Sequence, residues 1–370
     1  DEFPDNLDKF FVCRDERSII AFNIGDKSSG HFLTTNLDYP TFKLSPSGYR
    51  VHHFAEQVNA CPSGKGMWLT WPDRDLTIAG QAFIKDSQNT IKSKLVYPSK
   101  TTAYMPMLAV HLKPGSGIKA DLDIEKDFRP VFGFSDKDDD PEVEINGQFK
   151  QSPILMKLIS EECNCPIEDI VNFDLSLISA ENSAVIGVND DMISSQRISS
   201  IMVSIIALQQ FIESGKPSSG FNCFYGYTYN QETSQSISGP DSNFLDLTLK
   251  RIGISQFNKE FFSKSALYGL KFPCSNGGRG LYYFSDLVGN YQSTMDFTAK
   301  TINKLTTAGI KSQLVASKGV NSQGISSIAK RFAMPSFAFG VPIYGLYSIR
   351  ETVFIQDLGV LRKAIKTLLE

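Results

Sequence analysis

Residues Trp68–Gly80 read W-L-T-W-P-D-R-D-L-T-I-A-G, in which two apolar runs flank a short turn-forming stretch. Similar runs of strand length, separated by turn residues, extend from about Ser45 to Pro114. They read Y-R-V-H-H-F, T-I-A-G-Q-A-F-I, K-L-V-Y and M-L-A-V-H-L. Because this length and spacing are typical of all-β units, the sequence predicts a β-rich domain here, with strands in both halves of the quoted stretch.

The chain on either side of this domain has a different pattern. Before it, Lys9–Asp38 holds two strand-like runs, S-I-I-A-F-N-I-G and H-F-L-T-T-N-L. After Ser152, strand-like and helix-like segments alternate to the end of the chain, which predicts an α/β fold: a mixed β-sheet sandwiched by helices. The expected strands are Asp169–Ile178, Gly220–Tyr229, Ser312–Ala316 and Ser336–Tyr344, and the expected helices are Ile154–Cys163, Met192–Ser214, Phe244–Ile252, Thr294–Ala308, Ile325–Phe332 and Thr352–Leu369.

The composition excludes several classes of function. The chain has 370 residues, 41% of them hydrophobic and 21% charged, as is ordinary for a globular protein. A net charge of -3, without blocks of Lys and Arg interleaved with aromatics, argues against nucleic-acid binding. Apolar runs such as Ile201–Leu208 are far shorter than the roughly 20 residues of a membrane helix. We expect no membrane association and a cytoplasmic location, with the vacuole as an alternative.

The stretch Trp68–Gly80 closely resembles the W-x-T-W-F-D-R-D-L-x-x-A-G signature of the aspartyl aminopeptidase family, which includes vacuolar aminopeptidase I. Other family motifs follow in the same order as in that family: Phe10–Phe22, Met107–Leu112, Ile167–Leu177 and Tyr347–Glu351. The resemblance implies a zinc-aminopeptidase-like α/β domain, formed by residues 1–44 and 152–370. It also implies an inserted β-rich dimerisation or oligomerisation domain at 45–151, and assembly into a homo-oligomer, a dodecamer.

The chemistry of such an enzyme makes strict demands. Two zinc ions need a bridging carboxylate, further His and carboxylate ligands, and a glutamate that takes a proton from the bridging water. The resemblance implies that the first ligand comes from a motif A-H-T-D-S-P, which here reads T-N-L-D-Y-P with Asn36 in place of the histidine. The last ligand comes from M-H-S-I-R-E, which here reads L-Y-S-I-R-E with Tyr347 in its place.

Of the three remaining motifs, one keeps its metal ligand, one keeps a ligand but loses the base, and one loses its ligand. The bridging aspartate of R-L-D-N corresponds to Asp190 in V-N-D-D, so this ligand is retained. The motif D-N-E-E-V-G-S reads Y-N-Q-E-T-S-Q, which places Gln231 at the general base and Glu232 at a retained ligand. A glutamine cannot accept the proton of the water. The segment Ser265–Lys271 stands where the family has S-A-D-M-A-H-A and contains no acidic residue.

The chain has four histidines, all in its first third, and none after Leu112. Most of the metal ligands and the catalytic base are therefore replaced, while the surrounding motifs remain readable. We interpret the chain as a pseudoenzyme: a catalytically inactive, aspartyl-aminopeptidase-like protein without cofactor, retained for self-assembly or for binding a protein or peptide partner. One alternative is a metalloaminopeptidase that removes N-terminal acidic residues with a reduced zinc site. Another is a regulatory subunit that assembles with an active paralogue.

His111 lies in M-L-A-V-H-L. In the family, the histidine of this motif reaches from the inserted domain towards the active site of a neighbouring subunit. The resemblance therefore marks His111 as an oligomer contact. The equally open alternative is a strand histidine that forms only local hydrogen bonds.

Overall fold

The computed structural model describes residues 8–107, 128–135, 143–145, 149–228, 236–255, 258–273, 278–286, 294–317 and 323–370. The chain forms two compact units. Unit 1 contains Asp1–Tyr39, Ser183–Tyr347 and Glu351–Glu370, and unit 2 contains Pro40–Asn182 and Ser348–Arg350. The division therefore runs differently from the expected boundaries after 44 and 151, because the segment from 152 to 182 packs with the β-rich unit.

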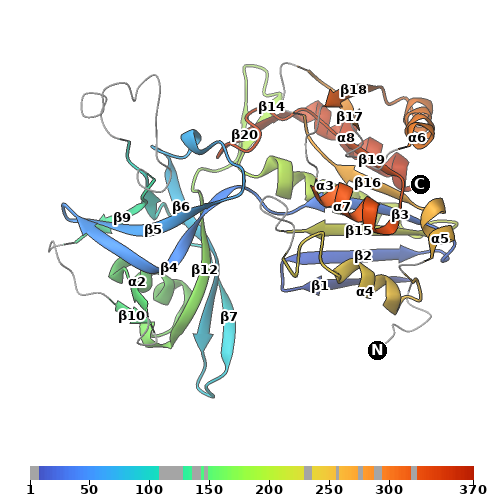
Figure 1. Ribbon diagram of the computed structural model, residues 1–370. Coiled ribbons are helices and arrows are strands. Elements are labelled where there is room, and N and C mark those ends of the chain that lie inside the picture. The colour runs from blue at the N-terminus through green and yellow to red at the C-terminus, as the bar shows by residue number, and fades with distance from the viewer. Residues whose placement is uncertain are drawn as a thin grey trace. The chain divides into compact units, whose positions relative to one another are not determined.

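An eight-stranded mixed sheet forms the centre of unit 1 (Figure 1). Its four middle strands run parallel to one another, as in the α/β fold that the sequence predicts, and the remaining pairings include antiparallel ones. In spatial order the strands are β1 (Lys9–Arg14), β2 (Ser18–Ile24), β15 (Phe221–Tyr227), β3 (Gly30–Asn36), β16 (Ala266–Leu270), β19 (Ser336–Gly340), β17 (Leu281–Asp286) and β18 (Ser312–Ser317).

Helices cover both faces of this sheet. One face packs against α4 (Phe244–Arg251), α5 (Lys259–Lys264) and α7 (Gln323–Phe332). The other packs against α3 (Val203–Ser214), α6 (Met295–Thr307) and α8 (Ile355–Leu369). Because neighbouring residues of a strand point to opposite faces, Phe32 belongs to the first core and Leu33 to the second. Every residue of β15 is buried, as expected for a strand covered on both sides.

Two predicted helices begin later than the sequence indicates. Met192–Ser195, expected as the start of a helix, is strand β14, and Glu351–Phe354 forms β20 directly before α8. The two strands pair with each other, and β13 (Ala184–Ile186) completes a three-stranded sheet. A π-helical turn, Ile198–Met202, follows β14 before α3 begins. The prediction was wrong here because pairing between distant segments overrides helical periodicity.

Unit 2 is a closed β-barrel. Its strand order is β12-β4-β5-β9-β8-β6, and β12 also pairs with β6, which closes the ring; β7 pairs with β6 outside it. A two-stranded sheet and helix α2 accompany the barrel. The elements are β4 (Thr41–His52), β5 (Ala55–Ser63), β6 (Asp75–Lys85), β7 (Ile91–Val96), β8 (Ala103–Tyr104), β9 (Val131–Phe134), β10 (Val143–Ile145), β11 (Phe149–Gln151), α2 (Pro153–Cys163), the 3-10 turn Ile167–Asp169 and β12 (Ile170–Ser179). None of the helices in the described ranges is long and apolar enough to cross a membrane.

The stretch Trp68–Gly80 holds the barrel together at three points. Trp71 is buried in the core and contacts Phe42 edge to face. The carboxylate of Asp73 accepts hydrogen bonds from the Tyr104 hydroxyl at 2.8 Å and from a backbone N–H in the following loop. Gly80 pairs with β12 so closely that a Cβ atom there would lie 2.0 Å from the carbonyl oxygen of Asp174. The first half, Trp68–Thr70, is a 3-10 turn and not the predicted strand.

We therefore predict that Gly80→Ala destabilises unit 2 by about 1–3 kcal/mol, since the backbone of β12 must move to admit the added carbon. Both tryptophans of the chain lie in unit 2, so tryptophan fluorescence during urea unfolding reports on this unit. Gly133→Ala is the matched control, because a Cβ atom there meets only the side chain of Ile154. Equal unfolding midpoints for the two variants would contradict the prediction.

Candidate functional site

Three neighbouring parallel strands of unit 1, β15, β3 and β16, end at the same edge of the sheet. Ligands of open α/β sheets bind beyond the carboxyl ends of such strands. Asn36 is the last residue of β3 and pairs with Tyr227, the last residue of β15. The segment Ser265–Lys271, which lacks the family's aspartate, contains β16. The fold thus brings Asn36, one of the replaced metal-ligand positions, to this edge, and β16 of the segment Ser265–Lys271 lies next to its strand.

The side chain of Asn36 is engaged by its own chain. Its amide nitrogen donates to the carbonyl oxygen of Asp38 at 3.0 Å, and its amide oxygen accepts from the N–H of Asp38 at 3.3 Å. A side chain that closes such a turn has both ends of its amide occupied. Asn36 therefore stabilises the turn that follows β3, and its oxygen faces a backbone donor.

Tyr347 and Glu351 form a second local structure close to this edge. Tyr347 has a left-handed backbone conformation, with φ of 66°, and its N–H donates to Oε1 of Glu351 at 2.9 Å. Glu351 is fully buried. Its carboxylate also accepts from the Ser199 N–H at 2.7 Å and from the Ser199 hydroxyl at 2.8 Å. The glutamate thus joins the turn at Tyr347 to the π-helical turn before α3.

Three tyrosines gather around these groups, and we call Tyr39, Tyr227 and Tyr347 the tyrosine cluster. The hydroxyl of Tyr39 donates a hydrogen bond to Glu351. Burial raises the pKa of Tyr39, and the negative charge of Glu351 raises it further. Burial also raises the pKa of Tyr227, to which Asp38 and Tyr347 add smaller contributions. The phenols of Tyr39 and Tyr227 therefore keep their protons at neutral pH.

Asp190, the retained bridging position, lies in the turn between β13 and β14. Its backbone is left-handed, with φ of 52°, and its N–H donates to the carbonyl oxygen of Gly187 at 3.2 Å. The residue is exposed to solvent. The hairpin that carries it is fixed to unit 1 by the pairing of β14 with β20. Asp190 is thus held in place by local backbone structure.

Among the described residues, the donors at this edge do not fit a two-zinc centre. Zinc binds thiolate, imidazole and carboxylate groups, whereas Asn36 offers an amide oxygen that already accepts a hydrogen bond. Binding through Tyr227 would require loss of a proton that burial opposes. Within the described ranges, no three His, Cys, Asp or Glu side chains lie close enough together to hold a metal ion. Gln231, Glu232 and His111 lie outside the described residues.

Comparison with known proteins gives the family. The model of the aminopeptidase I zinc metalloprotease (M18) family matches residues 2–270. The chain belongs to this family. Aspartyl aminopeptidase 1 of Schizosaccharomyces pombe is 29% identical over 258 residues, which cover 66% of this chain and 54% of that protein. Aspartyl aminopeptidase 4 of Saccharomyces cerevisiae is 29% identical over 268 residues, with coverage of 66% and 54%. The chain thus spans about half the length of these curated relatives.

Solved M18 structures have the same fold. The structure of the Ape4 and Nbr1 complex matches with a TM-score of 0.89 at 22% identity and covers 98% of this chain and 76% of that one. The S. cerevisiae mApe1 dodecamer matches with a TM-score of 0.82 at 16% identity, covering 98% and 85%. The predicted α/β fold and the predicted family are therefore confirmed.

The structure also reveals a site residue that sequence reasoning missed. In the motif Tyr347–Glu351, the sequence comparison identified only the first residue as a site position, because the family has a zinc ligand there. The fully buried group is the last one, Glu351, whose carboxylate accepts the N–H of Tyr347. A signal was present in the sequence, because a glutamate that opens an apolar strand is seldom buried without partners.

We predict that Glu351→Gln destabilises unit 1 by about 2 kcal/mol, since an amide nitrogen then faces a backbone N–H and leaves a buried donor unsatisfied. The helix signal in circular dichroism during urea unfolding measures the change, because helices α3–α8 belong to unit 1. The control is Glu260→Gln, which removes an exposed ion pair with Lys264 and should leave the midpoint nearly unchanged. A Glu351→Gln midpoint equal to that of the control would refute a structural role for the carboxylate.

Proposed function

We propose that this M18 family member does not hydrolyse peptides and that it acts through self-assembly or through binding of a protein or peptide. The observation that carries the proposal is the hydrogen bonding of the Asn36 side chain. At the end of β3, where the family resemblance places a zinc-binding imidazole, the amide of Asn36 closes a turn with Asp38. The tyrosine cluster and Glu351 supply further hydrogen-bonded groups around the same edge.

Loss of the base supports the proposal independently. Gln231 stands where the family has its catalytic glutamate, and an amide takes no proton from water. General-base catalysis contributes about 10²–10⁴-fold to rate, so its loss alone would leave a weak enzyme. Loss of metal ligands removes the activated water as well. The alternative of a reduced metal site rests on Asp190 and Glu232, of which Asp190 lies on an exposed turn.

One prediction of this proposal concerns the hydrolysis of peptides. Purified protein supplied with zinc, manganese or cobalt should release no N-terminal Asp or Glu from a short peptide above the background of the buffer. Glu232→Ala is the matched variant, because it removes the second retained ligand position and separates intrinsic turnover from a contaminating peptidase. Turnover that Glu232→Ala abolishes would overturn the proposal in favour of an active metalloaminopeptidase.

Another prediction of this proposal concerns self-assembly. Unit 2 exposes large apolar side chains, among them Leu95 at 78% and Phe134 at 76% of their full area, as is common for protein-contact surfaces. The similar mApe1 structure is described as a dodecamer. Light scattering should therefore give a mass several times the 41.1 kDa of one chain. A monomer at micromolar concentration would remove the assembly part of the proposal.

Variants locate the contact surface. Leu95→Asp and Phe134→Asp each replace an exposed apolar side chain of unit 2 with a charge and should lower the mass. Leu314→Asp makes the same change at a half-exposed leucine of unit 1 and serves as the control. Native mass spectrometry of protein taken from its own cells tests the remaining alternative, since a regulatory subunit would appear together with an active paralogue.

A further inference from the structure

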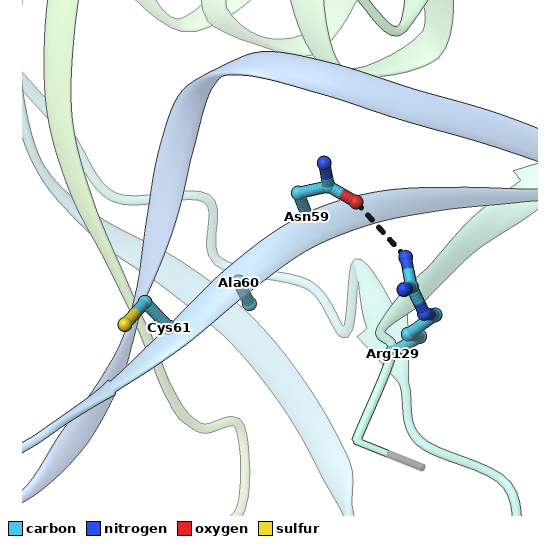
Figure 2. Close-up of a pocket in the computed structure, with 4 residues that line it drawn as sticks. All are labelled: Asn59, Ala60, Cys61 and Arg129. Atoms are coloured by element: carbon cyan, nitrogen blue, oxygen red, sulfur yellow. Dashed lines mark hydrogen bonds between the residues drawn. The ribbon is translucent and has the colours of Figure 1, made fainter. Parts of the chain in front are cut away.

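Unit 2 contains a pocket of about 290 Å³ on the outer side of strand β5, separate from the edge described above. Its lining residues are Asn59, Ala60, Cys61 and Arg129 (Figure 2). Asn59 and Cys61 are exposed and lie on the same side of the strand, since they are two residues apart. Arg129 precedes β9, which pairs with β5, and its guanidinium reaches across to Asn59.

The guanidinium of Arg129 is only partly satisfied. Nη1 donates to Oδ1 of Asn59 at 3.0 Å. Nε is buried and has no hydrogen-bond partner among the residues that the structure describes. An unsatisfied buried donor is costly, and more so when it is charged, so such a group in a folded protein needs an explanation. A ligand that accepts hydrogen bonds in the pocket would provide one.

A second arginine lies close to the first. Arg50, on β4, pairs with Gln57 of β5, and its Nε donates to the Gln57 side chain at 2.7 Å. Burial lowers the pKa of Arg50, and the charge of Arg129 lowers it further. Within the described part of unit 2, both guanidinium groups bond to amide side chains and neither forms an ion pair with a carboxylate. Two like charges therefore lie near each other, and one of them, Arg129, lines the pocket.

We propose that this pocket binds the oxyanion group, a phosphate or a carboxylate, of a small molecule. A planar guanidinium donates two parallel hydrogen bonds to such a group, and a negative charge bound at Arg129 would offset the repulsion between Arg129 and Arg50. The Asn59 side chain adds a neutral amide beside the bound oxygens. This function is independent of peptide hydrolysis and of the metal-ligand positions in unit 1, and it stands whether or not the proposed loss of activity is correct.

Isothermal titration of the full chain tests the proposal. Inorganic phosphate and succinate are titrated separately, each against chloride at matched ionic strength, so that the two arms distinguish a phosphate from a carboxylate ligand. We expect saturable binding of one ion per chain in at least one arm. Arg129→Gln and Arg50→Gln should each weaken it about tenfold or more, because each removes charge-assisted hydrogen bonds. Lys85→Gln removes the same charge from an exposed position of unit 2 and should bind as the wild type does.

The variants must be folded for the comparison, and tryptophan fluorescence of unit 2 checks this. Arg129→Lys keeps the charge without the two-pronged geometry and is expected to bind with intermediate strength, which provides a second variant if a glutamine substitution unfolds the barrel. Absence of saturable binding in both arms would overturn the proposal. Binding that is equally strong in the Arg129→Gln, Arg50→Gln and Lys85→Gln variants would also overturn it.

Discussion

The buried carboxylate of Glu351 is the interaction on which the edge of the unit 1 sheet depends. It accepts hydrogen bonds from Ser199, which is 152 residues away in sequence, and from the N–H of Tyr347. The hydroxyl of Tyr39 donates to it as well. One side chain at the start of β20 thereby joins three segments: the end of the chain's first β-region, the turn before α3 and the turn at Tyr347. Burial raises the pKa of this carboxyl group, and the hydrogen bonds from Ser199 and Tyr347 act against that rise.

Among the described residues, the groups around this carboxylate hydrogen-bond to one another and do not fit a two-zinc centre. In a zinc site, imidazole and carboxylate groups are held by further partners so that their lone pairs face the ion. Here the amide of Asn36 and the carboxylate of Glu351 face N–H donors of the protein itself. Tyr39 and Tyr227 retain protons that a metal would have to displace. The proposed loss of hydrolysis follows from this exchange of partners together with the replacement of the base by Gln231.

Much of the fold could be predicted from the sequence because its strongest signals are local. The fully buried strand β15 and the amphipathic helices α4, α6 and α7 lie where periodicity places them. The pairing of β14 with β20 could not be predicted, because it joins segments far apart whose residues also suit a helix. The packing of residues 152–182 with the β-rich unit could not be predicted for the same reason, since β12 closes the barrel through long-range pairing with β6.

The sequence predicted the positions of several site residues but not their contacts, for a related physical reason. Motif comparison finds the positions at which residue types have changed, and it led to Asn36, Asp190 and Tyr347. It does not show what a changed side chain now contacts. The turn at Asn36 and the donors around Glu351 appear only once the backbone places β3, the π-helical turn and β20 together. The arginine pair of the barrel has no motif at all, because Arg50 and Arg129 are brought together only by the order of β4, β5 and β9.

Anomalous diffraction at the zinc absorption edge, from crystals grown with zinc in excess, tests the central claim most directly. The account predicts no anomalous peak at the edge formed by Asn36, Tyr227 and Tyr347, even at a zinc concentration that saturates an intact family member. A peak about 2 Å from the Asp190 or Glu232 carboxylate, or a pair of peaks about 3.5–4 Å apart, would contradict it.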